Sequence, residues 1–191
     1  MPPITKTLII ANVAVFLGQL FLGIDLIGML GLWPGAFAPW QLVTYAFLHG
    51  SITHLLFNML GVYMMGAELE RVLGAGRYLR CYLFSVIAGA LTQLLVAWLT
   101  QDLERPVIGA SAGVFGLVLG YAMYFPRRRV VLLFPPIPMQ ARTFAAVYAI
   151  LELFLGVTGT QMGVAHFAHL GGMLGAYLSI RYFPSESSFR R

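Results

Sequence analysis

The sequence predicts an all-α membrane protein, a single bundle of six transmembrane helices, and three features support this fold class. Of the 191 residues, 59% are hydrophobic and only 10% are charged, which is too little polar material to cover a soluble globule of this size. Apolar runs recur along the chain, each close to the ~20 residues that span a bilayer. The basic residues stand at the ends of these runs. The lipid bilayer is therefore the expected surroundings of most of the chain.

Each apolar run is interpreted as one span. The runs lie near residues 8–24, 55–67, 81–99, 107–125, 143–158 and 164–180. The second and fifth runs are short, but each extends into flanking residues that a helix end can carry, at 51–54 and 140–142. The first run follows Lys6 as a signal peptide would, yet it contains polar residues and has no small-residue cleavage site before Asp25. We therefore expect it to remain as a helix of the bundle.

The segment of about 26–50, between the first and second runs, departs from this helical plan. It combines aromatic residues with helix-breaking prolines, namely Trp33, Pro34, Phe37, Pro39, Trp40, Tyr45 and Phe47. Aromatic rings of this kind gather at the level of the lipid headgroups, so we expect the segment to lie in the outer interface. An ordinary amphipathic loop is the alternative.

The basic residues predict which ends of the helices face inward. With the amino terminus inside, six spans bring every lysine and arginine to the inner side except Arg105. Both termini are then inside, and residues 184–191 form a short cytoplasmic tail on a single domain that covers residues 1–191. The net charge of +5 comes from basic residues at the inner ends of the helices, which form no stripe. The sequence therefore predicts no nucleic-acid partner.

Polar side chains within three of the spans converge on one depth. His54 and Asn58 are one helical turn apart on the second run, Ser111 begins the fourth and His169 belongs to the sixth. These three spans all run from outside to inside. At ~1.5 Å per residue, Asn58, Ser111 and His169 lie roughly 7 to 11 Å below the outer boundary. Three helices therefore contribute to one polar layer.

Each of these residues also has an ordinary structural explanation. A serine in a transmembrane helix more often bonds its own helix or aids packing than acts as a nucleophile. The G-x-S-x-G pattern at 109–113 is weak evidence, and no strand precedes it as an α/β-hydrolase would require. What favours catalysis is the combination of a candidate nucleophile, a candidate base and two further donors in one layer.

Small residues predict that the fourth and sixth spans pack closely. Glycines lie on the fourth span roughly opposite Ser111, at Gly113, Gly116 and Gly120. The fourth span is therefore expected to be central, with its serine side toward the sixth. On the sixth span Gly172 and Ala176 lie on or beside the face of His169, which would allow the ~3 Å approach of a Ser-His hydrogen bond.

These motifs, taken in order, resemble those of the rhomboid intramembrane serine proteases. The sequence HGSITHLLFNM at 49–59 resembles the H-x-x-x-x-H-x-x-x-N segment of the family, GASAG at 109–113 its serine motif, and AHLGG at 168–172 its histidine motif. The resemblance implies a six-helix core with a Ser-His dyad and no aspartate. It implies Ser111 as nucleophile, His169 as base, and His54 and Asn58 as the pair that stabilises the oxyanion.

The resemblance also selects between two nearby histidines. The family places glycine three residues after the catalytic histidine, which fits His169 with Gly172 better than His166. Phe115, one turn below Ser111, would supply an aromatic face against the imidazole. Without an aspartate, that face and the surrounding packing would have to orient the ring.

Three positions carry weaker expectations. The chain has Trp40-Gln41 where many members have Trp-Arg, which puts the loop's structural role in doubt more than catalysis. Glu70 resembles a family glutamate and is expected to be structural. Glu152, midway along the fifth run, has no assigned role but is costly enough there to need a partner.

The function that this resemblance implies is an intramembrane serine endopeptidase that cleaves single-span membrane proteins near the outer face. The compactness of the chain favours a prokaryotic inner membrane as its location. A polytopic transporter and a catalytically silent rhomboid-like binding protein are the alternatives. A metal-dependent protease is disfavoured because no H-E-x-x-H occurs and no acidic residue is expected beside the histidines. No metal and no cofactor are expected, Cys81 can form no intramolecular disulfide, and the oligomeric state is open.

Overall fold

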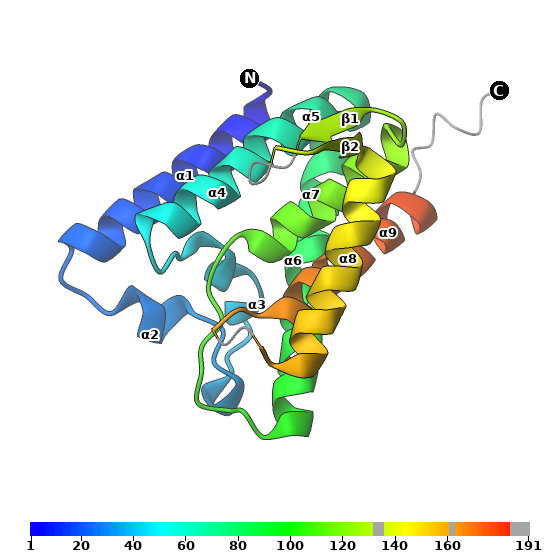
Figure 1. The fold of residues 1–191 in the computed structure, drawn as a ribbon. Coiled ribbons are helices and arrows are strands. Elements are labelled where there is room, and N and C mark those ends of the chain that lie inside the picture. The colour runs from blue at the N-terminus through cyan, green and yellow to red at the C-terminus, as the bar shows by residue number, and fades with distance from the viewer. Residues whose placement is uncertain (132–135, 161–162, 184–191) are drawn as a thin grey trace.

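A computed structural model of the chain describes residues 1–131, 136–160 and 163–183. These residues are mostly helical, and the helices pack side by side in one bundle (Figure 1). The expected tail at 184–191 lies outside the described residues.

Helices lie over every apolar run of the sequence. Within the described ranges, three helices are long and apolar enough to cross a membrane: α1 (Pro3–Phe21), α6 (Ala75–Thr100) and α8 (Ala141–Thr158). The second run is one helical stretch made of α4 (Ile52–Gly61), a π-helical turn (Val62–Gly66) and α5 (Ala67–Leu73). The others, α7 (Ser111–Tyr124) and α9 (His166–Tyr182), are shorter. The chain is thus an integral membrane protein, while the number of spans stays a prediction.

Helix α7 lies at the centre of the bundle, as its glycines predicted. It contacts α4, α5, α6, α8 and α9. A Cβ atom on Gly113 would lie 2.4 Å from the ring of Tyr82 on α6, and one on Gly172 of α9 would lie 2.1 Å from the carbonyl oxygen of Ala112. Only hydrogen fits at these contacts, so the backbones of neighbouring helices approach closely.

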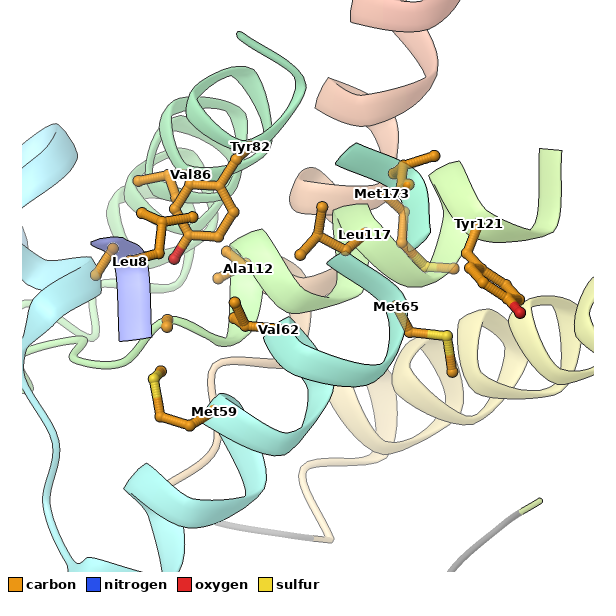
Figure 2. Packing of buried hydrophobic residues seen from close by; sticks show 14 of the residues in the cluster. Leu8, Met59, Val62, Met65, Tyr82, Val86, Ala112, Leu117, Tyr121 and Met173 are labelled. Carbon is orange, nitrogen blue, oxygen red and sulfur yellow. The ribbon is translucent and has the colours of Figure 1, made fainter. Parts of the chain in front are cut away.

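Buried apolar side chains surround this central helix. Met59, Val62 and Met65 from the second helical stretch belong to one buried cluster with Ala112 and Leu117 of α7 (Figure 2). Tyr82 and Val86 of α6 and Met173 of α9 belong to the same cluster. The core therefore fixes α7 from several sides, which matters because α7 begins at Ser111.

The segment between α1 and α4 is folded into short helical turns. These are α2 (Leu26–Leu30), a 3₁₀ turn (Pro34–Ala36), α3 (Gln41–Thr44) and a second 3₁₀ turn (Tyr45–Phe47). Gln41 is buried, and its Oε1 accepts hydrogen bonds from the backbone N–H groups of Trp33 at 3.1 Å and Ala38 at 3.3 Å. Gln41 therefore links the start of α3 to the backbone on both sides of the first 3₁₀ turn.

A two-stranded hairpin is a feature that the sequence interpretation lacked. Strand β1 (Arg129–Val131) pairs antiparallel with β2 (Pro138–Gln140) between α7 and α8. Just before β1, Arg128 forms an ion pair with Glu68 of α5, which also accepts the hydroxyl of Tyr121. The strands are three residues each, too short for a period-2 pattern to be recognised among basic residues and prolines.

Glu70 joins the second helical stretch to the start of α1. Its carboxylate accepts hydrogen bonds from the backbone N–H of Ile4 at 2.9 Å, and from the N–H and hydroxyl of Thr5, both at 2.7 Å. Glu70 is only 3% exposed. The first turn of an α-helix leaves its N–H groups without intrahelical partners, so this carboxylate satisfies donors that would otherwise be buried unpaired. These hydrogen bonds account for the structural role expected for Glu70.

Replacing Glu70 with alanine is therefore expected to destabilise the fold. Each buried N–H left without a partner costs about 1 to 3 kcal/mol, so we expect the free energy of unfolding to fall by about 2 kcal/mol or more. Unfolding in mixed detergent measures it. Glu68→Ala is the matched control, because the side chains of Glu68 and Arg128 are 35% and 53% exposed and such pairs contribute less than about 1 kcal/mol. Equal losses in the two variants would contradict the capping role.

Candidate active site

The four site residues predicted from the sequence line a single cavity of about 590 Å³. His54 and Asn58 enter it from α4, Ser111 from α7 and His169 from α9. Its apolar walls include Phe57 and Met64 from the second helical stretch, Phe115 from α7, and Phe144 and Tyr148 from α8. The convergence that was expected from charge and spacing is present in the geometry, with helix α8 as a further wall.

Ser111 is the first residue of α7 and follows a constrained turn. Gly109 has φ 122°, a region that favours glycine, and its N–H bonds the carbonyl oxygen of Tyr45 at 2.9 Å. A Cβ atom there would lie 2.7 Å from Nε2 of His54. The turn thus brings the imidazole of His54 against the backbone that leads into Ser111. Because the first N–H groups of a helix have no intrahelical acceptor, the amide of Ser111 can serve a ligand in the cavity.

His169 is the histidine that contacts the serine. Its Nε2 lies 2.8 Å from Oγ of Ser111, within hydrogen-bond distance. Its ring stacks on Phe115, with centroids 4.3 Å apart and planes 4° apart, as expected for this aromatic position. His166 lies one turn earlier on α9, and its Nδ1 contacts Glu152. The structure therefore separates the two histidines in the way that the glycine spacing suggested.

Glu152 is a residue of this site that sequence reasoning did not place there. Its Oε2 lies 2.8 Å from Nδ1 of His169 and 2.7 Å from Nδ1 of His166. The expectation of a partner for Glu152 is met, but the expectation that no acidic residue accompanies the histidines was wrong. A signal was available, because Glu152 stands six residues before the end of α8 at Thr158, ~9 Å along the axis. If Thr158 lies at the outer boundary, as the charge distribution predicts, that distance falls within the roughly 7 to 11 Å counted for the other site residues.

Asn58 and His54 lie one turn apart on α4. The side-chain N–H of Asn58 donates to the carbonyl oxygen of His54 at 3.0 Å, and Asn58 is buried. An amide nitrogen carries two hydrogens, so a second remains to be donated into the cavity. Ser51 caps the helix by accepting the N–H of His54 at 3.1 Å. The ring of His54 packs edge-on against His49, with centroids 5.0 Å apart.

Glu152, His166 and His169 also form a cluster of the type that holds metal ions. One ligand atom from each lies within 4.8 Å of the others, and imidazole with carboxylate is a common donor set. In this structure Oε2 of Glu152 is hydrogen-bonded to Nδ1 of both His166 and His169. The described arrangement thus satisfies these polar groups through mutual contacts, and any metal would compete with those contacts.

Comparison with known proteins agrees with the motifs. The family model for the Rhomboid domain matches residues 36–185, a range that includes Ser111, His169, His54 and Asn58. The chain is 32% identical over 139 residues to "Putative rhomboid protease YdcA" of Bacillus subtilis, with 73% of this chain and 64% of the relative covered. It is 29% identical over 143 residues to "Rhomboid protease GluP" of the same organism, covering 73% of this chain and 25% of GluP. The chain therefore matches under two thirds of the length of each.

Proposed function

Because this chain belongs to the rhomboid family, we propose that it is an intramembrane serine endopeptidase with Ser111 as nucleophile and His169 as general base. The observation that carries the proposal is the 2.8 Å contact between Oγ of Ser111 and Nε2 of His169, at the wall of a cavity inside the bundle. A packing serine would bond within its own helix instead.

The proposed reaction proceeds by covalent catalysis. As Oγ of Ser111 attacks the substrate carbonyl carbon, its proton passes to Nε2 of His169, and the carbonyl oxygen becomes an oxyanion. When the C–N bond breaks, His169 returns the proton to the leaving amine, and the acyl group remains on Ser111. Water then loses a proton to His169 and attacks the ester carbon. When the bond to Oγ breaks, His169 returns that proton to Oγ, which releases the acid and restores the serine.

Three donors are available for the oxyanion. They are the backbone N–H of Ser111, the side-chain amide of Asn58 and the imidazole of His54. All three groups belong to residues that line the cavity, where apolar walls strengthen such hydrogen bonds. The closeness of His54 to Gly109 is the contact that supports its assignment.

Loss of the Asn58 amide is expected to slow catalysis without a matching loss of substrate binding. We expect Asn58→Ala to lower kcat on the order of 10² to 10³-fold, or about 3 to 4 kcal/mol, with KM changed little. Steady-state cleavage of a fluorescent substrate measures both constants.

Asn12→Ala provides the control for Asn58→Ala. Asn12 on α1 is also a buried asparagine, and it donates to the carbonyl oxygen four residues earlier, that of Leu8 at 2.8 Å. The control is expected to lose stability but to keep the kcat of its folded fraction. A fall in kcat of similar size for the two variants would argue against an oxyanion role for Asn58.

The length of α7 supports a site recessed in the bilayer. Its 14 residues measure ~21 Å, about 9 Å short of a hydrocarbon core of ~30 Å. If its end at Tyr124 lies at the inner boundary, Ser111 lies ~9 Å below the outer one. We therefore propose six spans with both termini inside, and single-span membrane proteins as substrates that are cleaved near their outer ends. The bacterial relatives favour a prokaryotic inner membrane.

Reconstitution tests the proposal directly. The purified chain in liposomes is expected to cleave a single-span substrate with and without chelator, and a fluorophosphonate is expected to label Ser111, as mass spectrometry of the labelled peptide would verify. Loss of cleavage on chelation would favour a metal-dependent reaction. A folded chain that binds the substrate but neither cleaves it nor takes the label would be a silent binding protein, and solute flux without cleavage would indicate a transporter.

A further inference from the structure

The carboxylate of Glu152 on α8 contacts Nδ1 of the proposed base, His169, while Ser111 contacts the other ring nitrogen, Nε2. Glu152 is the only charged side chain between residues 143 and 158, and its side chain is 9% exposed. An ionisable group inside a span is energetically costly, and such groups usually have a partner and a functional role. The contacts of Glu152 are with two ring nitrogens of α9, and one of them belongs to His169.

We propose that Glu152 is a positioning residue that acts through His169, so that this chain uses a Ser-His-Glu triad in place of a dyad. The proposal rests on the proposed function of Ser111 and His169. It corrects the expectation that stacking and packing alone must orient the imidazole.

The hydrogen-bond geometry assigns the protons. For Nε2 of His169 to accept the hydroxyl hydrogen of Ser111, the ring hydrogen must be on Nδ1. That N–H points to a carboxylate oxygen at 2.8 Å. An ionised carboxylate accepts but cannot donate, so its presence selects the tautomer that the reaction needs. Phe115 holds the face of the same ring, and Glu152 holds its edge.

The charge of Glu152 also matters once the reaction begins. When His169 takes the proton of Ser111, the ring becomes a cation whose Nδ1–H still faces the carboxylate. The opposite charges are in contact in a buried setting, which lowers the energy of the ion pair that forms with the oxyanion. The proton stays on Nδ1, and Glu152 remains ionised throughout.

The alternative is that Glu152 only holds α8 and α9 together. A variant of His166 distinguishes these two roles of Glu152. Its Nδ1 bonds the same oxygen of Glu152 at 2.7 Å, from the same helix, but Ser111 is in contact with His169. His166→Gln alters the tie between the helices and leaves the contact of Glu152 with His169. If Glu152 only joins the helices, His166→Gln and Glu152→Gln should have similar effects on catalysis.

The experiment compares kcat, KM and the rate of Ser111 phosphonylation in the wild type, Glu152→Gln and His166→Gln, with folded protein quantified by thermal unfolding. Glu152→Gln keeps the shape and removes the charge. We expect it to lower kcat and the phosphonylation rate on the order of 10²-fold or more, with KM within about threefold. His166→Gln is expected to change kcat less than about fivefold while losing comparable stability. Equal falls in kcat for both variants, or a Glu152→Gln enzyme within fivefold of wild type, would overturn the proposal.

A spectroscopic measurement covers the case in which Glu152→Gln does not fold. Protein with ¹⁵N-labelled histidine is expected to give a low-field proton resonance for Nδ1–H of His169, and this resonance should persist in Ser111→Ala. A resonance at the position of an ordinary solvated imidazole would overturn the triad. The failure of the proposed function and the failure of the triad can be told apart. A wild type that cleaves nothing and takes no label would contradict the protease function, whatever the position of the His169 resonance.

Discussion

Replacement of Ser111 by alanine is expected to lower kcat for cleavage of a single-span substrate on the order of 10⁴-fold or more. The reason is that Oγ is the atom that would form the acyl bond, and no neighbouring hydroxyl occupies its place beside Nε2 of His169 among the described contacts. His169→Ala is expected to cost a similar factor, because the hydroxyl then has no base. The double variant should be no slower than either single one, since the two groups act as a unit.

Ser85→Ala is the matched control for Ser111→Ala. Ser85 is a fully buried serine on α6, and its hydroxyl donates to the carbonyl oxygen of Cys81 at 2.8 Å, which is the ordinary behaviour of a serine in a helix. Its loss is expected to leave kcat within about threefold of wild type. Gel-based cleavage in liposomes resolves both extremes. Cleavage by Ser111→Ala at the rate of Ser85→Ala would end the serine mechanism.

The substitution Gly172→Ala is expected to lower both activity and stability, although Gly172 does not line the cavity. A Cβ atom there would lie 2.1 Å from the carbonyl oxygen of Ala112 and 2.7 Å from its carbonyl carbon. Both atoms are backbone, so α9 must move away from α7. His169 is three residues before Gly172 on α9, and a shift of ~1 Å in a reacting pair can cost on the order of 10²-fold. We expect kcat/KM to fall by at least that factor and the unfolding temperature to fall with it.

Gly76→Ala is the control for this second experiment. Gly76 lies in the first turn of α6, and a Cβ atom there meets nothing within 4 Å. Alanine is the better helix former, so this variant should be as stable as the wild type or slightly more stable, with unchanged kcat/KM. Wild-type activity in Gly172→Ala would mean that the contact between α7 and α9 is looser than the distances indicate.

The polar layer could be predicted from sequence because its members obey simple counting. His54 and Asn58 are one turn apart, Ser111 begins its apolar run, and the charge distribution predicts the direction of each helix. Distances along a helix axis then follow from residue number. The close packing of α7 was equally accessible, because glycines at helical spacing have few other uses inside a membrane.

Glu152 and Gln41 illustrate what counting along single helices does not give. The depth of Glu152 was countable, but its direction around α8 depends on how that helix packs against α9, which no pattern in an apolar run records. Gln41 is bonded to the backbone N–H groups of Trp33 and Ala38 in the preceding loop, and such pairings depend on loop geometry. The hairpin of β1 and β2 was not predicted, because strands of three residues are too short to show a recognisable alternation of apolar and polar residues.

The start of α7 at Ser111 has a consequence for how catalysis could survive mutation. The aligned peptide units of a helix leave roughly half a positive charge at its amino end. If α7 begins below the membrane surface, as proposed, bulk water screens that charge less than it would at an exposed helix end. The reacting oxygen atoms would lie in this field from the outset. Because the field comes from the backbone, no side-chain replacement at Asn58 or His54 can remove it. A protein without both side chains would therefore keep a basal rate, set by the macrodipole of its central helix.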